Sequence, residues 1–157
     1  MHGKTLDERF WSKVDRSGEC WVWTSCLNKK GYGNFRVSGR TVLAHRMSYS
    51  LHHGIDIPPD MQIDHRTTCP KSCVNPDHLR VVTGKQNNEN RAGAQANNIS
   101  TGIRGVHFNK RLGKWTASAK SGGKTYHGGC FNSPGDAENA AIELRNRLFT
   151  HNDLDRR

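Results

Sequence analysis

The sequence has few residues with which to build a large core, and it has no long hydrophobic segment. Only 33% of its 157 residues are hydrophobic and 8% are aromatic. No apolar run approaches the roughly 20 residues that cross a bilayer, and residues 1–9 lack the apolar stretch of a signal peptide. We therefore expect an intracellular, cytoplasmic protein that is not secreted and has no membrane partner. Small units with thin cores often need a metal or a partner for stability.

Acidic residues are also scarce in this chain. There are 14 Asp and Glu against 24 Lys and Arg, which gives a formal net charge of +10. Residues 1–91 hold 14 basic and 9 acidic side chains, and residues 92–157 hold 10 and 5. This even excess predicts a polyanionic partner that touches both halves. The alternative is a soluble basic protein with no such partner.

Five cysteines cannot all pair with one another, and in a reducing compartment thiols or metal ligands are expected instead of disulfides. Cys69, Cys73 and His78 offer three donors in a short span, and either Cys20 or Cys26 can supply a fourth. Three cysteines and one histidine form a typical closed structural Zn²⁺ site. The alternative is a set of unrelated thiols beside a hydrogen-bonding histidine.

The periodic patterns of the first half predict short helices and strands. In order, these are a helix over 5–14, strands within 20–43, a helix over 42–53, strands over 61–65 and 79–82, and a helix over about 84–92. Thr5 is the expected N-cap of the first helix, and Thr83 with Gln86 has the spacing of a capping box.

The second half predicts three strands followed by one helix. The strands cover 102–109, 114–120 and 124–131, and Ser133-Pro134 is a typical helix start. The helix has an apolar stripe that consists of Ala137, Ala140, Ala141, Leu144 and Leu148. The expected class is α+β, with one domain over 1–91, a linker over 92–100 and a second domain over 101–151. Residues 92–100 could equally form a segment that becomes ordered along DNA.

Asp64, His65 and Asn87 suggest hydrolysis of a phosphodiester. A neutral imidazole such as that of His65 can take a proton from water near pH 7. The oxygens of Asp64 and Asn87 are ligands that suit Mg²⁺, and a strand-loop-helix hairpin can bring them to one ion. Neighbours in a strand point to opposite faces, however. An isolated Asp-His pair is more often an ordinary surface turn.

The order of these residues resembles that of the HNH (ββα-metal) endonucleases of the phage and homing type. The resemblance rests on Asp64-His65, on Cys73-Val-Asn75-Pro-Asp-His78-Leu and on Asn87. The cysteines are similar to those of the His-Cys box homing endonucleases. Three upstream matches extend the HNH resemblance to about residues 18–91. They are Cys20-Trp21, Gly31-Tyr32-Gly33 and Ala44-His45-Arg46.

The resemblance implies a role for each matched residue. His65 would be the general base, with Asn87 and Asp64 as ligands of a catalytic Mg²⁺ or Mn²⁺. Asn75 would brace the loop. The structural zinc ligands would be Cys20, Cys69, Cys73 and His78.

Arg46 is the expected phosphate clamp of the first half, because a guanidinium group can hold a phosphate through two hydrogen bonds. It could instead pair with Asp56 or Asp60. The neighbouring histidines are expected to be packing or surface residues; they are His45, His52 and His53.

The second half resembles an AP2-type DNA-binding domain through Gly102-Ile-Arg-Gly105-Val-His-Phe, Lys114-Trp115 and the helix that contains Ala137. This implies a sheet that lies in the major groove of double-stranded DNA. The candidate contacts are Arg104, His107, Lys110, Arg111, Lys114, Trp115, Lys120 and Lys124. Alternatively, Trp115 packs in the core and the lysines form a solvated rim. Cys130 is expected to be a small buried residue.

Together these features predict a site-directed DNA endonuclease in which the first domain cuts and the second selects the site. One alternative is a sequence-specific DNA-binding regulator that does not cleave. Another is a structural basic protein that binds without sequence preference. No leucine-zipper heptad marks a dimer face, so a monomer that nicks one strand is preferred over a homodimer.

Overall fold

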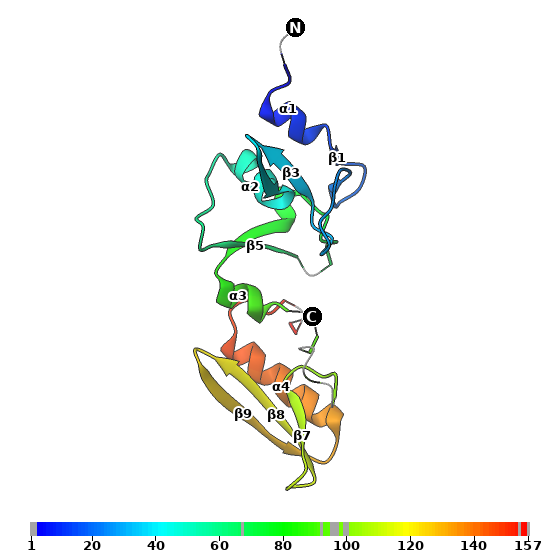
Figure 1. Ribbon diagram of the computed structural model, residues 1–157. Helices are drawn as coiled ribbons and strands as arrows, with labels where there is room; N and C mark the ends of the chain where they lie inside the picture. The colour runs from blue at the N-terminus through cyan, green and yellow to red at the C-terminus, as the bar shows by residue number, and fades with distance from the viewer. Residues whose placement is uncertain are drawn as a thin grey trace. The chain divides into compact units, whose positions relative to one another are not determined.

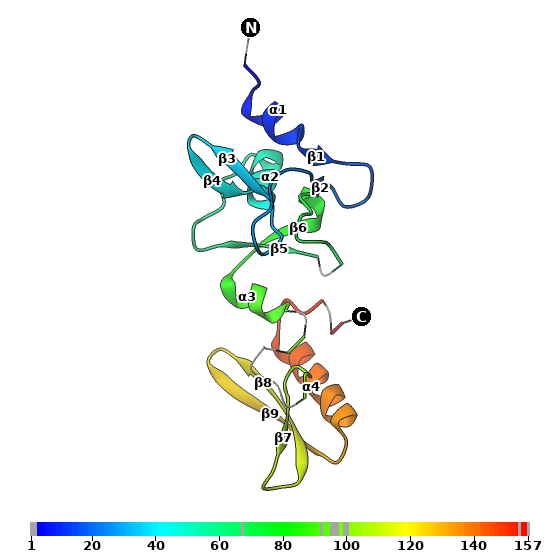
Figure 2. The same ribbon diagram turned by 45° about the vertical axis from the view of Figure 1, so that its right-hand side comes forward.

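The computed structural model describes residues 3–66, 68–91, 93–94, 98, 101–153 and 155–156. The chain divides into two compact units, Met1–Asn87 and Asn88–Arg157, and each is considered by itself (Figures 1 and 2). Most of the expected linker over 92–100 lies outside the described residues. No helix among the described residues is long and apolar enough to cross a membrane.

The first unit begins with α1 (Leu6–Trp11), which has Thr5 as its N-cap, as the sequence predicts, and forms a capping box with Glu8. The Thr5 hydroxyl accepts a hydrogen bond from the Glu8 amide at 3.2 Å, and Glu8 Oε2 accepts one from the Thr5 amide at 2.8 Å. The predicted helix over 5–14 is too long at its end. Val14 belongs instead to β1 (Val14–Asp15), which pairs with β2 (Val22–Trp23).

The core of the first unit is a small aromatic cluster. Hairpin β3 (Asn34–Val37) and β4 (Arg40–Leu43) leads directly into α2 (Ala44–His53). Phe10, Trp23 and Phe35 pack against one another with ring centroids 5.1–5.8 Å apart. The helix predicted over 42–53 begins two residues later, because the preceding residues complete β4.

The element that positions the candidate site is a hairpin followed by a helix. Strand β5 (Gln62–His65) pairs antiparallel with β6 (Leu79–Val82), and α3 (Gly84–Glu89) follows. A 3-10 turn, η1 (Pro76–His78), ends the loop between the strands. The Thr83–Gln86 capping box is present, since the Gln86 amide donates to the Thr83 hydroxyl at 3.2 Å and the Thr83 amide to Gln86 Oε1 at 2.8 Å. The helix ends at Glu89, three residues before its predicted end.

The second unit is a three-stranded antiparallel sheet covered by one helix. The strands β7 (Val106–Asn109), β8 (Lys114–Ser121) and β9 (Lys124–Phe131) lie in that order. Helix α4 (Pro134–Leu148) is capped by Ser133 and packs its alanines on one sheet face, against Val106 and Ala117. The first strand begins at Val106, four residues later than predicted. The α+β class is confirmed.

The packing around Gly33 leaves no room for a side chain. A Cβ atom at this position would lie 2.7 Å from the Trp23 ring and 2.8 Å from Ala44 Cβ. We expect Gly33→Ala to lower the free energy of unfolding by about 1–3 kcal/mol, the usual cost of overpacking. Urea denaturation followed by tryptophan fluorescence measures this. Gly18→Ala is the matched control because a Cβ at Gly18 meets no atom within 4 Å; equal stability of the two variants would contradict the packing account.

Candidate active site and metal centre

A short backbone ladder brings β2 beside the loop that joins β5 to β6. The Trp23 amide donates to the Ser72 carbonyl at 2.9 Å, and the Val74 amide donates to the Trp21 carbonyl at 2.7 Å. This pairing places Cys20 next to Cys73, although they are far apart in sequence. Cys73 itself is completely buried.

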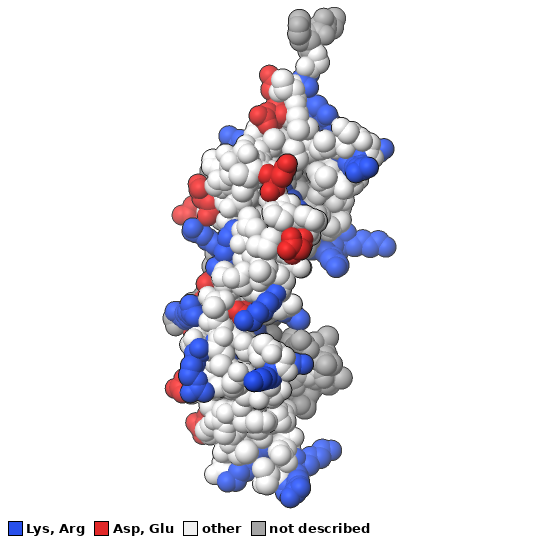
Figure 3. Space-filling model, turned by 90° about the vertical axis from the view of Figure 1, so that its left-hand side faces the viewer, with Lys and Arg blue, Asp and Glu red and all other residues white. Residues whose placement is uncertain are grey.

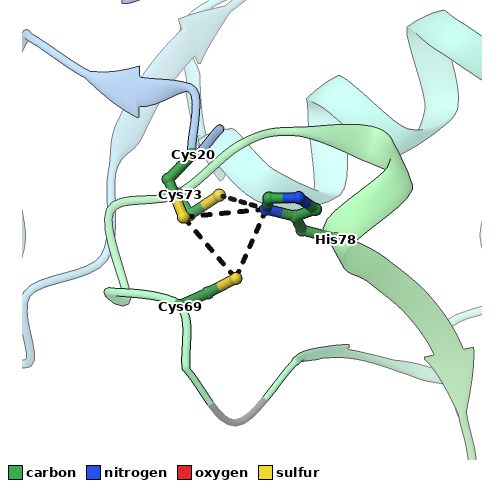
Figure 4. A group of neighbouring side chains, drawn as sticks. All are labelled: Cys20, Cys69, Cys73 and His78. Atoms are coloured by element: carbon green, nitrogen blue, oxygen red, sulfur yellow. Dashed lines mark hydrogen bonds between the residues drawn. The ribbon is translucent and has the colours of Figure 1, made fainter. Parts of the chain in front are cut away.

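Four metal-binding side chains meet at this point (Figure 4): Cys20, Cys69, Cys73 and His78, with all ligand atoms within 4.8 Å of one another. His78 Nδ1 lies 3.6, 3.4 and 3.8 Å from the three sulfurs, and the Cys20 and Cys69 sulfurs are 3.7 Å apart. In a tetrahedral zinc site the ligand bond lengths give edges of about 3.5–3.8 Å. The donor set and its dimensions therefore fit Zn²⁺.

Two thiols of this cluster, those of Cys69 and Cys73, have raised pKa values. Burial, a hydrogen bond with Cys20 and the charge of Cys73 raise the pKa of Cys69 to about 12. Burial also raises the pKa of Cys73. A bound cation reverses this balance because it stabilises thiolates directly, and metal binding at such a set releases protons.

Asn75 and Cys26 take different places around the cluster. Asn75 is buried and connects two segments, since its Nδ2 donates to the Glu19 carbonyl at 2.8 Å and its Oδ1 accepts from the Asp77 amide at 3.1 Å. Cys26 is exposed, and its sulfur lies 3.7 Å from the Leu27 carbonyl. Of the two cysteines that the sequence offered as a fourth donor, the structure brings Cys20 to the group.

The ring of His65 is fixed by the same loop. Its Nε2 atom lies 2.9 Å from the Cys73 carbonyl oxygen. A carbonyl only accepts hydrogen bonds, so Nε2 carries the proton and Nδ1 of the neutral ring is the acceptor. Burial lowers the pKa of His65, against the opposite effects of this hydrogen bond and of Asp64. The lowered pKa favours the neutral imidazole.

Two aromatic side chains pack near the His65 ring. The rings of Tyr32 and His45 have centroids 6.0 and 5.0 Å from that of His65. His45 is 4% exposed, and its buried Nδ1 has no hydrogen-bond partner in the described structure. Burial first, and then the charges of His65 and Arg46, lower the pKa of His45 to about 3. His45 is therefore a neutral packing residue, as expected.

The candidate ligands of a catalytic ion lie on the opposite side of β5. Arg80 Nη2 and Nε donate to Asp64 Oδ2 at 2.8 and 3.0 Å. Gln62 is two residues from Asp64 and so shares its strand face. Asn87 Nδ2 donates to Gln62 Oε1 at 2.6 Å, which fixes the orientation of the Asn87 amide and turns its oxygen away from Gln62. A carboxylate and an amide oxygen are the hard donors that Mg²⁺ and Mn²⁺ accept.

Arg46 does not have the contacts that the sequence suggested. Its guanidinium donates to three backbone carbonyls, those of Met61 at 2.6 Å, Ile57 at 3.0 Å and Pro58 at 3.1 Å. These bonds tie α2 to the segment that leads into β5. The expected phosphate clamp is thus a structural brace, and neither of its alternative partners, Asp56 or Asp60, holds it.

Two of the candidate DNA contacts in the second unit also have other roles. Arg104 donates to the carbonyls of Asn88, Glu89 and Arg91 at 2.8–3.2 Å. Trp115 packs against the cluster under α4, with its ring 4.9 Å from that of Phe108. The exposed candidates are His107, Lys110, Arg111, Lys114, Lys120 and Lys124.

Cys130 is exposed, contrary to expectation. Cys130 of β9 pairs with Thr116 of β8, and Thr116 in turn pairs with His107 of β7. Because Ala117 faces α4, its neighbour Thr116 and these paired residues face away from the helix. They belong to the sheet face that α4 leaves open.

Comparison with known proteins finds matches over part of the chain. Residues 42–89 match the model of the HNH endonuclease family. The chain is 37% identical over 71 residues to Protein 7.7 of Escherichia phage T7, covering 45% of this chain and 53% of that protein. It is 36% identical over 77 residues to Protein 2.8 of the same phage, covering 48% and 50%.

The chain spans about half the length of these two phage relatives. No solved structure matches it significantly.

The four-donor cluster predicts one tightly bound metal ion per chain. We expect Cys69→Ser to lose that ion and to lower Tm by more than about 5 °C, since metal binding contributes directly to folding. Elemental analysis and calorimetry of the purified protein measure both effects. Cys26→Ser is the matched control and should keep the metal. Full metal content in Cys69→Ser would show that the cluster is not the binding site.

Proposed function

We propose that this protein is a metal-dependent HNH endonuclease that hydrolyses phosphodiester bonds of duplex DNA, with His65 as the general base. The observation that carries the proposal is the hydrogen bond from His65 Nε2 to the Cys73 carbonyl at 2.9 Å. It leaves Nδ1 as the acceptor on a ring whose lowered pKa keeps it neutral. A neutral, oriented imidazole is what proton abstraction from water requires.

In this mechanism a water molecule attacks phosphorus while its proton passes to His65 Nδ1. Nε2 keeps its own proton throughout and donates it in a hydrogen bond to the Cys73 carbonyl. The imidazolium that forms is therefore already hydrogen-bonded. Tyr32 and His45 restrict rotation of the ring. We place the DNA backbone at the end of β5. There it can reach both His65, on one face of the strand, and Asp64, on the other face.

Asp64 and Asn87 are the proposed ligands of the catalytic Mg²⁺ or Mn²⁺. Such an ion, when bound, supplies charge that offsets the negative charge on the leaving 3′-oxygen. Arg80 and Gln62 orient the two side chains through the contacts described above. Few protein ligands suffice, because Mg²⁺ keeps several of its waters.

Zn²⁺ at Cys20, Cys69, Cys73 and His78 is the proposed structural cofactor. Its donor set is closed, with no position for substrate, which is typical of structural zinc. We infer that it stabilises the loop that presents the Cys73 carbonyl. Among the described residues of this loop, Val74 is the one that belongs to the hydrophobic core cluster.

The second unit is proposed to select the DNA site with its open sheet face, in the manner of an AP2-like domain. The exposed candidates named above surround this face. Figure 3 shows Lys and Arg side chains at separate points of the visible surface of this unit. Scattered cations suit phosphate contacts at several points of a duplex.

A non-cleaving regulator is the second candidate function, because a zinc-stapled fold with a basic sheet can bind DNA without cutting it. The presence of His65, Asp64 and Asn87 together argues for cleavage. The likeness to phage proteins supports a phage origin, and a site-directed or homing role is part of the proposal. One HNH centre cuts one strand, so a monomer would nick.

The central test of function is His65→Ala. We expect it to reduce nicking of supercoiled plasmid in Mg²⁺ by about 10²–10⁴-fold, the usual contribution of a general base, while DNA affinity is retained. His52→Ala is the control, since His52 is exposed and its ring contacts that of its neighbour His53. Undiminished cutting by His65→Ala would refute the assignment, and absence of cutting by the wild type with intact binding would favour the regulator.

The open sheet face gives a separate prediction. We expect the double variant Lys114→Gln, Lys120→Gln to bind duplex DNA more weakly and to lower the salt slope of log K by about two. Both lysines alternate with Ala117 and Ala119 along β8, so they lie with Thr116 on the open face. The control is Arg147→Gln, because Arg147 is an exposed residue of α4, on the covered side of the sheet. Gel-shift titrations at several salt concentrations supply the slopes. Equal slopes for the double variant and the wild type would remove these lysines from the interface.

A further inference from the structure

The proposed mechanism lacks a cation that holds the DNA backbone beside the general base. Hydrolysis of a phosphodiester is fast only when the phosphate is held in line with the attacking water. Arg46 is occupied by three backbone carbonyls, and Arg80 is paired with Asp64. A phosphate-binding group near His65 therefore has to come from another element.

The Gly31-Tyr32-Gly33 turn lies against the general base. The Tyr32 ring is 6.0 Å from the His65 ring and 5.2 Å from the His45 ring, measured between centroids. Gly33 fixes this position from behind, because Trp23 and Ala44 leave no room for a Cβ atom there. The turn is thus a rigid platform under one side of the His65 imidazole.

The same platform holds a lysine. Lys71 Nζ lies over the Tyr32 ring, 5.7 Å from its centroid. The Lys71 side chain also passes over Gly31, since a Cβ atom there would lie 3.9 Å from Lys71 Cδ. Gly31 has a φ of +89°, a conformation that other residues rarely adopt. Lys71 belongs to the loop between Cys69 and Cys73, so the metal cluster restrains its backbone from both sides.

We propose that Lys71 binds a DNA phosphate next to the scissile bond, and that Tyr32 is the positioning residue that holds Lys71 and His65 at a fixed separation. This inference rests on the proposed nuclease function. An ammonium group is a compact point charge that suits a phosphate oxygen. Lys71 is exposed, so DNA can reach it, while the ring contact limits where the charge can go.

Arg66 is the competing cation, because it follows His65 directly and is exposed. Among the residues that the structure describes, no contact holds the Arg66 side chain beside His65. Lys71 has such a contact, with its Nζ 5.7 Å from the centroid of the Tyr32 ring, and its side chain lies close to Gly31. The experiment therefore changes Lys71 and Arg66 separately.

The test compares four variants with the wild type: Lys71→Gln, Lys71→Arg, Arg66→Gln and Lys4→Gln. Lys4 is the charge-matched control, since it is exposed and precedes α1. Affinity for a short mixed-sequence duplex is measured without divalent ions over a range of salt concentrations, and nicking of supercoiled plasmid is measured in Mg²⁺. We expect Lys71→Gln to lower the salt slope by about one and to reduce nicking about tenfold or more, with Lys71→Arg largely restored.

Tyr32 supplies a second readout. Tyr32→Phe keeps the ring and should retain nicking, whereas Tyr32→Leu should lower the salt slope by the same amount as Lys71→Gln. A variant that is merely less stable would lose activity without this change in slope. Circular dichroism confirms that both variants are folded.

The outcomes separate this inference from the proposed function. If Lys71→Gln behaves like Lys4→Gln, or if the loss falls on Arg66→Gln alone, the inference is overturned, while nicking that depends on His65 still stands. If the wild type nicks no plasmid but Lys71→Gln lowers the salt slope by about one, the phosphate contact holds and the nuclease function fails.

Discussion

One residue, Cys73, connects the metal cluster to the proposed chemistry. Its sulfur belongs to the four-donor group, and its carbonyl accepts the hydrogen bond from His65 Nε2 at 2.9 Å. Its backbone also faces Val22 through the ladder that brings Cys20 into the cluster. A loop of this length has little core of its own, so a metal ion at the four donors, as proposed, would hold its conformation. Orientation of the general base is therefore coupled to the integrity of the cluster.

The arrangement separates the proposed tasks between the two sides of β5. One side carries the His65 ring, packed by Tyr32 and His45. The other side carries the oxygen donors, with Asp64 held by Arg80 and Asn87 by Gln62. The alternation of a strand produces this separation from two adjacent residues. Proton abstraction and metal binding can then be adjusted by different neighbours.

Much of the fold follows from local sequence signals. The N-cap at Thr5, the capping box at Thr83 and the Ser133-Pro134 start of α4 rest on contacts within a few residues, and the structure has them all. The two strands expected over 61–65 and 79–82 also pair with each other. The ends of the helices and strands were harder to predict. Val14 fits the period of α1 but pairs with Trp23, because a tertiary contact outweighs a marginal helix end.

The roles of the arginines could not be read from the sequence. Arg46 and Arg104 each bind three backbone carbonyls, and which carbonyls are left without partners depends on how distant segments pack. A basic residue in a chain of net charge +10 suggests a phosphate contact before its structural use is known. The choice of Cys20 over Cys26 likewise rests on the ladder between residues 21–23 and 72–74, a pairing without a local signal.

The most direct test of the central claim is the tautomer of His65 in the metal-loaded protein, measured by long-range ¹H–¹⁵N correlation of the imidazole ring at neutral pH. The account predicts a protonated Nε2 and an unprotonated Nδ1, because the Cys73 carbonyl can only accept. A ring with its proton on Nδ1, or one that exchanges freely between both tautomers, would contradict the claim that the metal-held loop prepares His65 as the base.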